Sequence, residues 1–160
     1  MKIFDNVAQL RLARLGTGQL VKTKGYYTAN DGGGAEYIIV ASGGTDNGGS
    51  YIDLALNQAE LILEKGIVDP LHYGYVVDTT TDNSDAIDAA ITYFDLITQT
   101  RQAVFKFPAG PCRITRKMDF SQTGGERRKV TGGSDFEVTE FLVDWNGYGT
   151  GAGDPIALVL

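Results

Sequence analysis

The chain has 160 residues and a net charge of −6, which argues against nucleic acid as its main partner. A single cysteine (Cys112) and a single histidine (His72) exclude an internal disulfide and a Cys- or His-rich metal cluster, and we expect no cofactor. No apolar run reaches the length of a signal peptide or the roughly 18 residues of a membrane span, so we expect a soluble product without a membrane partner. The 21 glycines and four prolines predict many turns rather than long helices.

The strand and turn patterns in the first part of the chain predict a small antiparallel β unit that ends near Lys65. Residues 1–15 have the pattern of one short helix, with Asp5 or Asn6 as N-cap and Gly16 at its end. Two strands, 19–28 and 35–40, form a hairpin around the glycine-rich turn 30–34. Residues 42–50 are predicted as a flexible loop, and 51–54 and 59–63 as two more strands. Residues 66–70 are predicted as a linker, with His72 as a linker residue.

The middle of the chain predicts one amphipathic helix. Apolar side chains recur at helical spacing on a single face, at Ala86, Ile87, Ala90, Ile91 and Phe94. Asp82 or Asn83 is the expected N-cap, because a short side-chain oxygen can accept an otherwise unpaired amide of the first turn. Six aspartates and no cation lie between residues 66 and 100, which we interpret as a solvated acidic surface.

Short strands and turns follow the helix. We expect strands at 103–107, 112–115, 128–130, 136–143 and 156–160, with Cys112 as a small buried hydrophobe. The last strand, IALVL, is almost wholly apolar, and an uncovered strand of this kind is prone to aggregation. We therefore expect this chain to be the N-terminal part of a longer protein.

The stretch around the helix resembles a known family. YGYVVDTTTDNSDAI (73–87) is similar to the entry motif of pectate-lyase-like right-handed β-helix proteins, and VFKFPAGPCRIT (104–115) to their next signature. The matching positions are Tyr73, Gly74, Asp78, Thr81, Asp82, Ala86 and Ile87. The resemblance implies that the helix caps the open end of a parallel β solenoid. Val77 and Thr79 replace family glycines, so the turn between residues 75 and 80 must differ.

The N-terminal region resembles a second family. GYYTANDGGGAEYIIV (25–40) is similar to the particle-binding module at the start of bacteriophage tailspikes and tail fibres. The positions that carry this anchor motif are Tyr26, Tyr27, Asp31, Gly32, Gly33, Gly34 and Tyr37. The three tyrosines are equally candidates for a protein–protein surface and for core or trimer-interface packing.

Together the two resemblances imply a mainly β chain with two domains. Residues 1–65 form a small antiparallel β anchor domain with a short N-terminal helix, and 66–160 form the helix-capped start of a right-handed parallel β-helix. The implied protein is a homotrimeric tailspike, made in the host cytoplasm and located in the virion. Its anchor binds a tail or baseplate protein, while the distal part binds, and often cleaves, host surface polysaccharide.

We assign no catalytic or metal-binding residue. Asp135, Glu137, Glu140 and Asp144 are the acids dense enough for sugar cleavage, but a polar outer face of a coil is the favoured interpretation. Asp78–Asp82 lacks the alternating ligands of an EF-hand and is better explained as a turn with an N-cap. The glycine-rich stretch 147–153 lacks the GK[ST] of a phosphate-binding loop.

Three functions remain open at this stage. The first is a structural virion component that attaches a receptor-binding or depolymerase spike to the phage tail. The alternative is a bacterial polysaccharide lyase or glycoside hydrolase with a β-helix fold. The third is an adhesin or carbohydrate-binding module, for which Trp145 and Tyr148 are the candidate aromatic pair.

Overall fold

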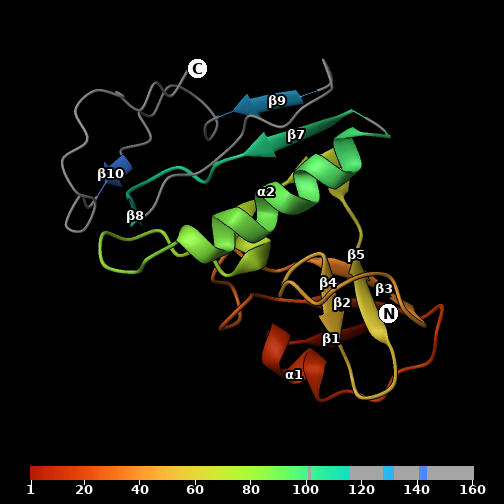
Figure 1. Ribbon diagram of the computed structural model, residues 1–160. Coiled ribbons are helices and arrows are strands. Elements are labelled where there is room, and N and C mark those ends of the chain that lie inside the picture. Colours follow the sequence, from red (N-terminus) through yellow and green to blue (C-terminus); the bar gives the residue numbers. More distant parts are fainter. Residues whose placement is uncertain (101, 116–127, 132–140, 144–160) are drawn as a thin grey trace.

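The structure is a computed structural model that describes residues 1–100, 102–115, 128–131 and 141–143. Its first half is a five-stranded sheet with the strand order β1-β2-β3-β5-β4. The strands are β1 (Lys2–Phe4), β2 (Leu20–Thr23), β3 (Glu36–Val40), β4 (Tyr51–Asp53) and β5 (Gln58–Leu61). Helix α1 (Val7–Arg11) packs beside this sheet (Figure 1).

The first fifteen residues differ from the predicted single helix. Lys2–Phe4 forms β1, which pairs with β2 in parallel, so the sheet is not wholly antiparallel. Helix α1 covers five residues only, and the Asn6 side chain caps it by accepting a hydrogen bond from the Gln9 amide (2.9 Å). Val7 and Leu10 are buried, while Leu12 lies 85% exposed beyond the helix. The apolar pattern was therefore too short to decide between a strand and a helix turn.

The predicted hairpin is confirmed, with shorter strands. β2 and β3 pair antiparallel, and β3–β5 and β5–β4 do the same. Val21, Tyr37, Ile39, Ile52 and Ala59 are fully buried, because alternate residues of each strand face α1 and the rest of the core. Tyr26 and Tyr27 lie beyond the end of β2 rather than in a strand.

The predicted linker is ordered structure. Ile67–Val68 forms β6, and Pro70–Tyr73 forms a turn of 3-10 helix (η2) that includes His72. A second 3-10 turn, η1 (Glu64–Gly66), joins β5 to β6. The linker prediction was wrong because the Asp69 side chain starts η2 by accepting from the Leu71 amide (3.0 Å), a cap that a composition argument overlooks.

The predicted long helix is confirmed as α2 (Ser84–Thr98). After it come β7 (Ala103–Lys106), β8 (Cys112–Ile114), β9 (Arg128–Thr131) and β10 (Phe141–Val143). These strands pair in parallel, as a three-stranded sheet β6-β7-β9 and a two-stranded sheet β8-β10. The predicted strand 156–160 and residues 136–140 of the preceding one lie outside the described residues.

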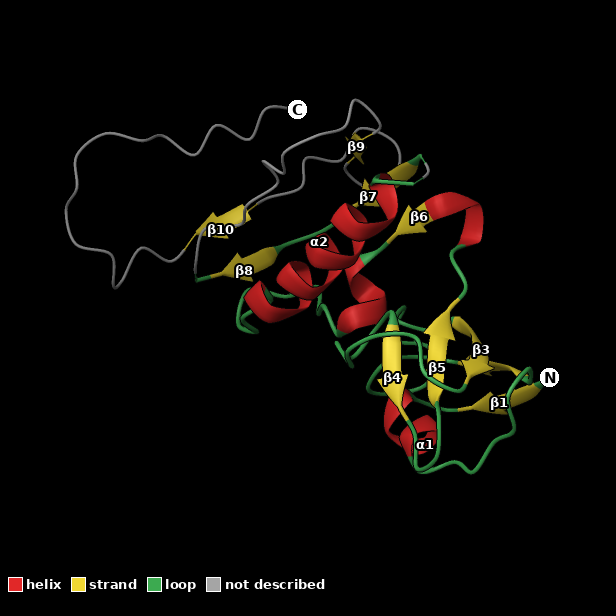
Figure 2. Ribbon diagram, turned by 45° about the vertical axis from the view of Figure 1, so that its right-hand side comes forward, coloured by secondary structure: helices red, strands yellow, loops and turns green. Residues whose placement is uncertain are grey.

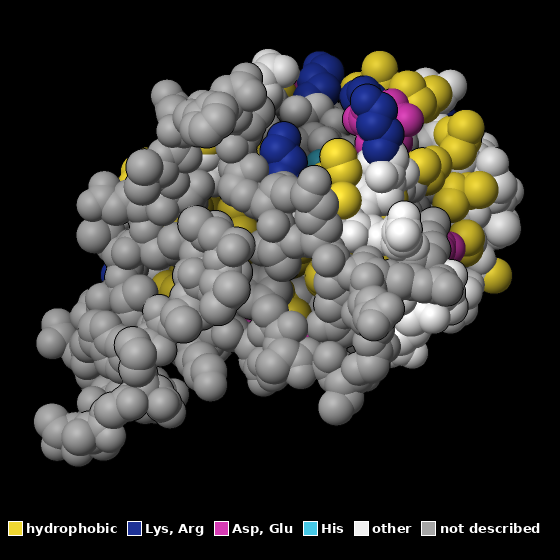
Figure 3. All heavy atoms as spheres, turned by 90° about the horizontal axis from the view of Figure 1, so that it is seen from above, with side chains coloured by type: hydrophobic (Ala, Val, Ile, Leu, Met, Phe, Trp, Pro, Cys, Tyr) yellow, Lys and Arg dark blue, Asp and Glu magenta, His cyan; other side chains and the backbone are white. Residues whose placement is uncertain are grey.

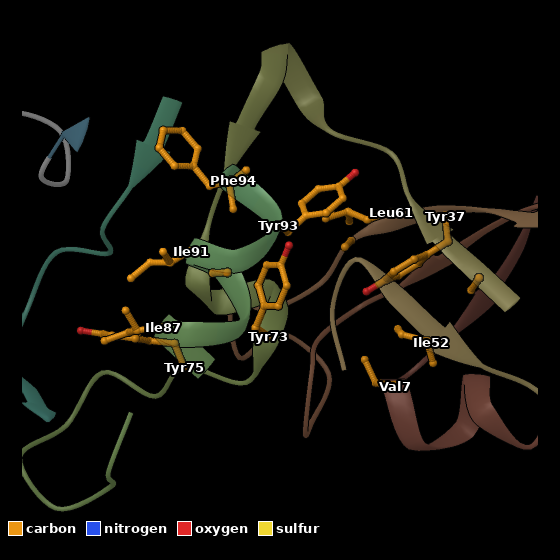
Figure 4. Close-up of a cluster of buried hydrophobic side chains, with 14 of the residues drawn as sticks. Val7, Tyr37, Ile52, Leu61, Tyr73, Tyr75, Ile87, Ile91, Tyr93 and Phe94 are labelled. Carbon is orange, nitrogen blue, oxygen red and sulfur yellow. The ribbon is translucent and has the colours of Figure 1, made fainter. Parts of the chain in front are cut away.

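Helix α2 is packed on two sides and forms the centre of the core. Tyr73 and Tyr93 lie between it and the five-stranded sheet, while Phe94 lies on the side of β7 (Figure 4). The Tyr93 ring meets Tyr51 of β4 edge-on (6.0 Å), and Phe94 meets Phe105 of β7 (5.5 Å). These contacts join the sheet and the parallel strands through one helix.

This packing corrects the predicted acidic surface in part, since Asp82 and Asp85 are exposed as predicted. Asp95 of α2 is 5% exposed, and Asp69 at the start of η2 is partly buried. Because both sides of α2 are covered, a single apolar face did not predict how much of the helix would be buried.

Candidate functional site

The anchor motif forms a tight loop, residues 25–34, built around Asp31. One carboxylate oxygen accepts from the amides of Tyr26 and Gly33 (2.9 Å each), and the other from Tyr27 (2.8 Å) and Thr28 (2.9 Å). Burial raises the pKa of Asp31, but these four hydrogen bonds outweigh it and hold the pKa below its usual value. The Asp31 side chain therefore fixes the backbone of the anchor loop.

The glycines of the anchor loop are required by close contacts. A Cβ atom on Gly25 would lie 1.8 Å from the Thr28 carbonyl oxygen, and one on Gly34 would lie 2.7 Å from the Thr23 carbonyl oxygen. Gly32 has φ of +91°, a conformation that favours glycine. The predicted turn is confirmed, but of its three glycines Gly32 alone has positive φ.

The anchor motif and the β-helix motif meet in space. A Cβ on Gly33 would lie 2.5 Å from the carbonyl oxygen of Leu71 in η2. A Cβ on Gly74, which follows η2 with φ of +90°, would lie 2.7 Å from the ring of Tyr26 and from the hydroxyl of Tyr27. Two motifs that are forty residues apart in the sequence thus form one contact surface.

A second contact also joins the five-stranded sheet region to η2. A Cβ on Gly49 would lie 2.3 Å from Cδ1 of Tyr73, so the Tyr73 ring fits directly on the Gly49 backbone. The Tyr73 side chain is 4% exposed. A side chain on Gly49 would therefore overlap Tyr73, and one on Gly74 would overlap Tyr26 and Tyr27.

The glycine-rich loop 42–50 is held by side chains, in contrast to the predicted flexible loop. Asp46 accepts from both Arg11 guanidinium nitrogens and from the amides of Gly48 (2.8 Å) and Asp53 (2.9 Å). The Arg11 hydrogen bond outweighs burial and lowers the pKa of Asp46 to about 2. Asn47 accepts from three following amides, including that of Tyr51 (3.2 Å).

Sequence reasoning missed Arg11, Asp46, Asn47 and Gln58. The Gln58 side chain accepts from the amides of Gly43 (2.6 Å) and Gly44 (3.1 Å) and thereby closes the loop from the opposite side. The available signal was the pair Asp46-Asn47 between glycines, since Asp and Asn side chains bond backbone amides two to four residues ahead.

Two aspartate side chains, those of Asp78 and Asp82, organise the turn before α2 in the β-helix motif. Asp78 accepts from the Thr81 amide (2.6 Å) and hydroxyl (2.8 Å) and from the Thr80 amide, which lowers the pKa of Asp78. Asp82 accepts from the amide (3.0 Å) and hydroxyl (2.6 Å) of Ser84 at the start of α2. The predicted turn at Asp78–Asp82 is confirmed, and Asp82 accepts from the first amide of α2 although it is not the N-cap residue.

Asn83 occupies the N-cap position, but its side chain does not cap the helix. Its amide group exchanges hydrogen bonds with the backbone of Val76 (2.7 and 2.9 Å) and lies 3.8 Å from the Cys112 sulfur. The backbone N–H of Asn83 donates to the Arg113 carbonyl (2.9 Å), and the Thr115 hydroxyl donates to the Asp82 carboxylate (2.6 Å). The start of α2 is therefore fastened to β8.

The predicted site residues differ in exposure. Tyr37 is fully buried in the sheet core, which corrects its role as a surface candidate, whereas Tyr27 is 58% exposed. Tyr26 is partly buried and packs edge-on against Tyr27 (4.7 Å). Ile87 is fully buried and Ala86 partly so.

The single cysteine and the single histidine are buried to different degrees. Cys112 is fully buried, as predicted. His72 is partly buried in η2 rather than in a linker, and burial lowers its pKa while raising the pKa of neighbouring Asp69. His72 lies in η2, which contacts α2, and Cys112 lies in β8 next to Asn83 at the start of α2.

The described residues contain no group of three His, Cys, Asp or Glu side chains placed to hold a metal ion. No helix among them is long and apolar enough to cross a membrane. The candidate acids 135, 137, 140 and 144, the stretch 147–153 and the pair Trp145 and Tyr148 lie outside the described residues.

The comparisons with known proteins agree with this architecture. Residues 3–85 match the family described as the phage tail protein small four-stranded beta-sheet domain. The match covers more than half of the chain, and the chain belongs to this family. It includes both the anchor loop and the start of α2. A search of curated proteins finds no match.

Solved structures similar to this chain include those of phage tailspikes. The tailspike protein gp49 of Acinetobacter baumannii bacteriophage Fri1, a capsular polysaccharide depolymerase, has 20% identity and a TM-score of 0.65, over 83% of this chain and 23% of its own. The enzymatically active domain of tailspike protein 4 from bacteriophage CBA120 has 15% identity and a TM-score of 0.60, over 93% and 19%.

A third similar structure is a bacterial protein. Pantoea stewartii WceF, a glycan biofilm modifying enzyme with a bacteriophage tailspike-like parallel beta-helix fold, has 20% identity and a TM-score of 0.61, over 82% of this chain and 21% of its own. At these identities the likeness concerns the fold, and the chain spans about a fifth to a quarter of the length of these proteins. The resemblance to phage tailspikes is thus confirmed.

Proposed function

We propose that this chain is the N-terminal part of a homotrimeric phage tailspike and that it attaches the spike to the tail or baseplate. In this proposal residues 1–65 bind the particle, and residues 66–160 cap and begin a right-handed β-helix. The residues of the anchor motif shape the particle-binding module, and those of the β-helix motif shape the cap.

One observation carries this proposal. The phage tail domain, residues 3–85, runs without a break into a helix that is covered on its other side by parallel strands. Parallel strands need long crossover connections, and a stack of them has an open apolar end that requires a cap. The packing of helix α2 between the sheet and β7 supports this capping role.

The proposed division of labour assigns polysaccharide binding to the part of the spike beyond this chain. The Fri1 relative is a capsular polysaccharide depolymerase, and this chain matches only 23% of its length. The described residues contribute packed loops and caps, so we place any cleavage of host polysaccharide on later coils. The distal part then selects the host, and this part holds the spike.

The proposal is tested by deleting residues 1–65 from the full-length spike and counting spikes on purified virions by quantitative mass spectrometry. We expect incorporation to be lost while the purified spike keeps its distal polysaccharide activity. The contacts of Tyr73 with Gly49 and of Gly74 with Tyr26 cross residue 65. Distal activity and trimer mass are therefore the necessary folding controls. Virions that carry normal numbers of truncated spikes would refute the proposal.

A second candidate function is a secreted or cell-associated polysaccharide lyase or hydrolase. The likeness to the Pantoea stewartii enzyme favours it, because the same fold occurs there in a glycan biofilm modifying enzyme. This candidate predicts a full-length protein that cleaves polysaccharide and never associates with particles. Co-sedimentation of the full-length protein with phage particles separates the two functions.

A further inference from the structure

The two edge strands of the five-stranded sheet differ in whether their outward backbone groups have hydrogen-bond partners. Figure 2 shows β1 at one end of the sheet and β4 at the other. On the β4 edge, the Asp53 amide donates to the Asp46 side chain (2.9 Å) and the Tyr51 amide to the Asn47 side chain (3.2 Å). The Tyr51 carbonyl accepts from the Asn47 amide (3.1 Å). Loop 42–50 therefore occupies the hydrogen-bonding groups of the β4 edge.

The β1 edge is open. The Phe4 carbonyl accepts from the Lys24 amide (2.9 Å), in the register that pairs Phe4 with Thr23. Because alternate residues of a strand bond to the same neighbour, the amide and carbonyl of Ile3 point away from β2. No backbone group of the described residues bonds to them. An open strand edge is a template for another strand.

Apolar side chains gather along the open edge. Three of them are exposed: Met1 (69%), Ile3 (57%) and Leu20 (50%). Leu20 is paired with Ile38 of β3, which extends the apolar strip onto the next strand. Figure 3 shows hydrophobic side chains along the right-hand side of the molecule. A shallow hollow of about 250 Å³ lies beside β1, lined by Met1, Lys2, Gln19 and Leu20. The edge thus offers backbone groups, apolar contact area and a hollow in one place.

The charges at this edge indicate the partner's chemistry. Lys22 is paired with Glu36 (3.1 Å) and Lys24 with Asp5 (2.7 Å). Lys2, which lines the hollow, has no carboxylate of a described residue within ion-pair distance. An acidic side chain on a partner would complement Lys2, and an apolar one would cover Ile3 and Leu20.

We propose that the β1 edge receives an extended segment of another protein, which adds a sixth strand to the sheet by backbone pairing with Ile3. The segment has an apolar residue against Ile3 and Leu20 and an acidic residue against Lys2. Backbone bonds supply affinity and the two side-chain contacts supply specificity. This proposal rests on the proposed attachment function, in which the added strand belongs to a tail or baseplate protein.

The test uses full-length spikes and phage particles. Ile3→Pro removes the outward amide without touching the bonds between β1 and β2, since proline is tolerated at edge positions that face away from the sheet. Ile3→Val is the matched control, because it keeps both the amide and an apolar side chain. With equal amounts of tagged variant and wild-type spike, we expect Ile3→Pro to be at least about tenfold under-represented on particles, and Ile3→Val to be equal to wild type.

Two further variants keep the test decisive. Lys2→Glu places like charge against the acidic residue and leaves the backbone intact, so it is expected to lower incorporation even if Ile3→Pro prevents folding. Leu56→Ser changes an 80% exposed leucine at the β4–β5 turn and is expected to have no effect. If Ile3→Pro and Lys2→Glu spikes fold and are incorporated like wild type, the edge proposal is overturned. If deletion of residues 1–65 also leaves incorporation unchanged, the attachment function itself is overturned.

Discussion

Asp31 is predicted to hold the anchor loop together, and the substitution Asp31→Asn measures its contribution. An asparagine keeps one acceptor oxygen, so two of the four amides bonded to Asp31 lose their acceptor and the others lose a charged one. Hydrogen bonds to charged groups contribute about 1.5–3 kcal/mol each, but water replaces part of this at an exposed loop. We therefore expect a loss of about 2–3 kcal/mol, or roughly 4–12 °C in Tm.

The assay is urea unfolding of the 160-residue chain at pH 7, followed by circular dichroism. Asp5→Asn is the matched control, because Asp5 is an exposed carboxylate whose single ion pair to Lys24 (2.7 Å) is screened by solvent and is expected to contribute little to stability. The pKa of Asp31 is lowered on folding, so its contribution is present above the unfolded value of about 3.9 and is lost as pH falls through the folded value. Two results would refute the reasoning. One is that Asp31→Asn and Asp5→Asn lower the unfolding free energy equally. The other is that the difference between wild type and Asp31→Asn stays the same when the pH is lowered.

Three further predictions concern the joint around α2. Gly49→Ala is expected to cost about 1–3 kcal/mol in unfolding free energy because its Cβ would overlap Tyr73, whereas Gly16→Ala, with no atom closer than 3.9 Å, is expected to change little. Phe94→Ala is expected to lower the unfolding free energy by about 3–5 kcal/mol, since Phe94 is 1% exposed and packs on β7. A loss below about 1 kcal/mol in urea unfolding, as for an exposed residue, would contradict this. Burial lowers the pKa of His72, so stability is retained above the unfolded value of about 6.5 and is lost as pH falls through the folded pKa. His72→Gln is expected to flatten this pH dependence in thermal melts, and an unchanged slope would contradict it.

The elements with a strong pattern could be predicted from the sequence. Helix α2 has five apolar positions at helical spacing, and β2 and β3 flank a turn with three glycines, so the helix and the hairpin were both found. The strand predicted at 19–28 is nevertheless shorter in the structure, at Leu20–Thr23. The anchor and β-helix motifs were found because their residues resemble those of known families, and the structure shows that close packing requires some of their glycines, as at Gly33 and Gly74. Even so, the sequence did not reveal that Gly74 and Tyr26 touch.

The short elements could not be predicted, because tertiary contacts decide them. Residues 2–4 form a strand only through pairing with β2, which lies almost twenty residues later. Residues 67–68 form a strand only through pairing with β7. Loop 42–50 is fixed by Gln58 and Arg11, which lie outside it in the sequence. A local pattern carries no information on such partners.

The central claim is that this chain attaches a spike to a phage particle. Its most direct test fuses residues 1–160 to a fluorescent protein, adds the fusion during assembly of particles that lack their own spike, and counts fluorophores per purified particle. The account predicts saturable decoration in groups of three copies, with a fusion mass in solution near three times that of one chain. Particles no more fluorescent than those given the fluorescent protein alone would contradict it.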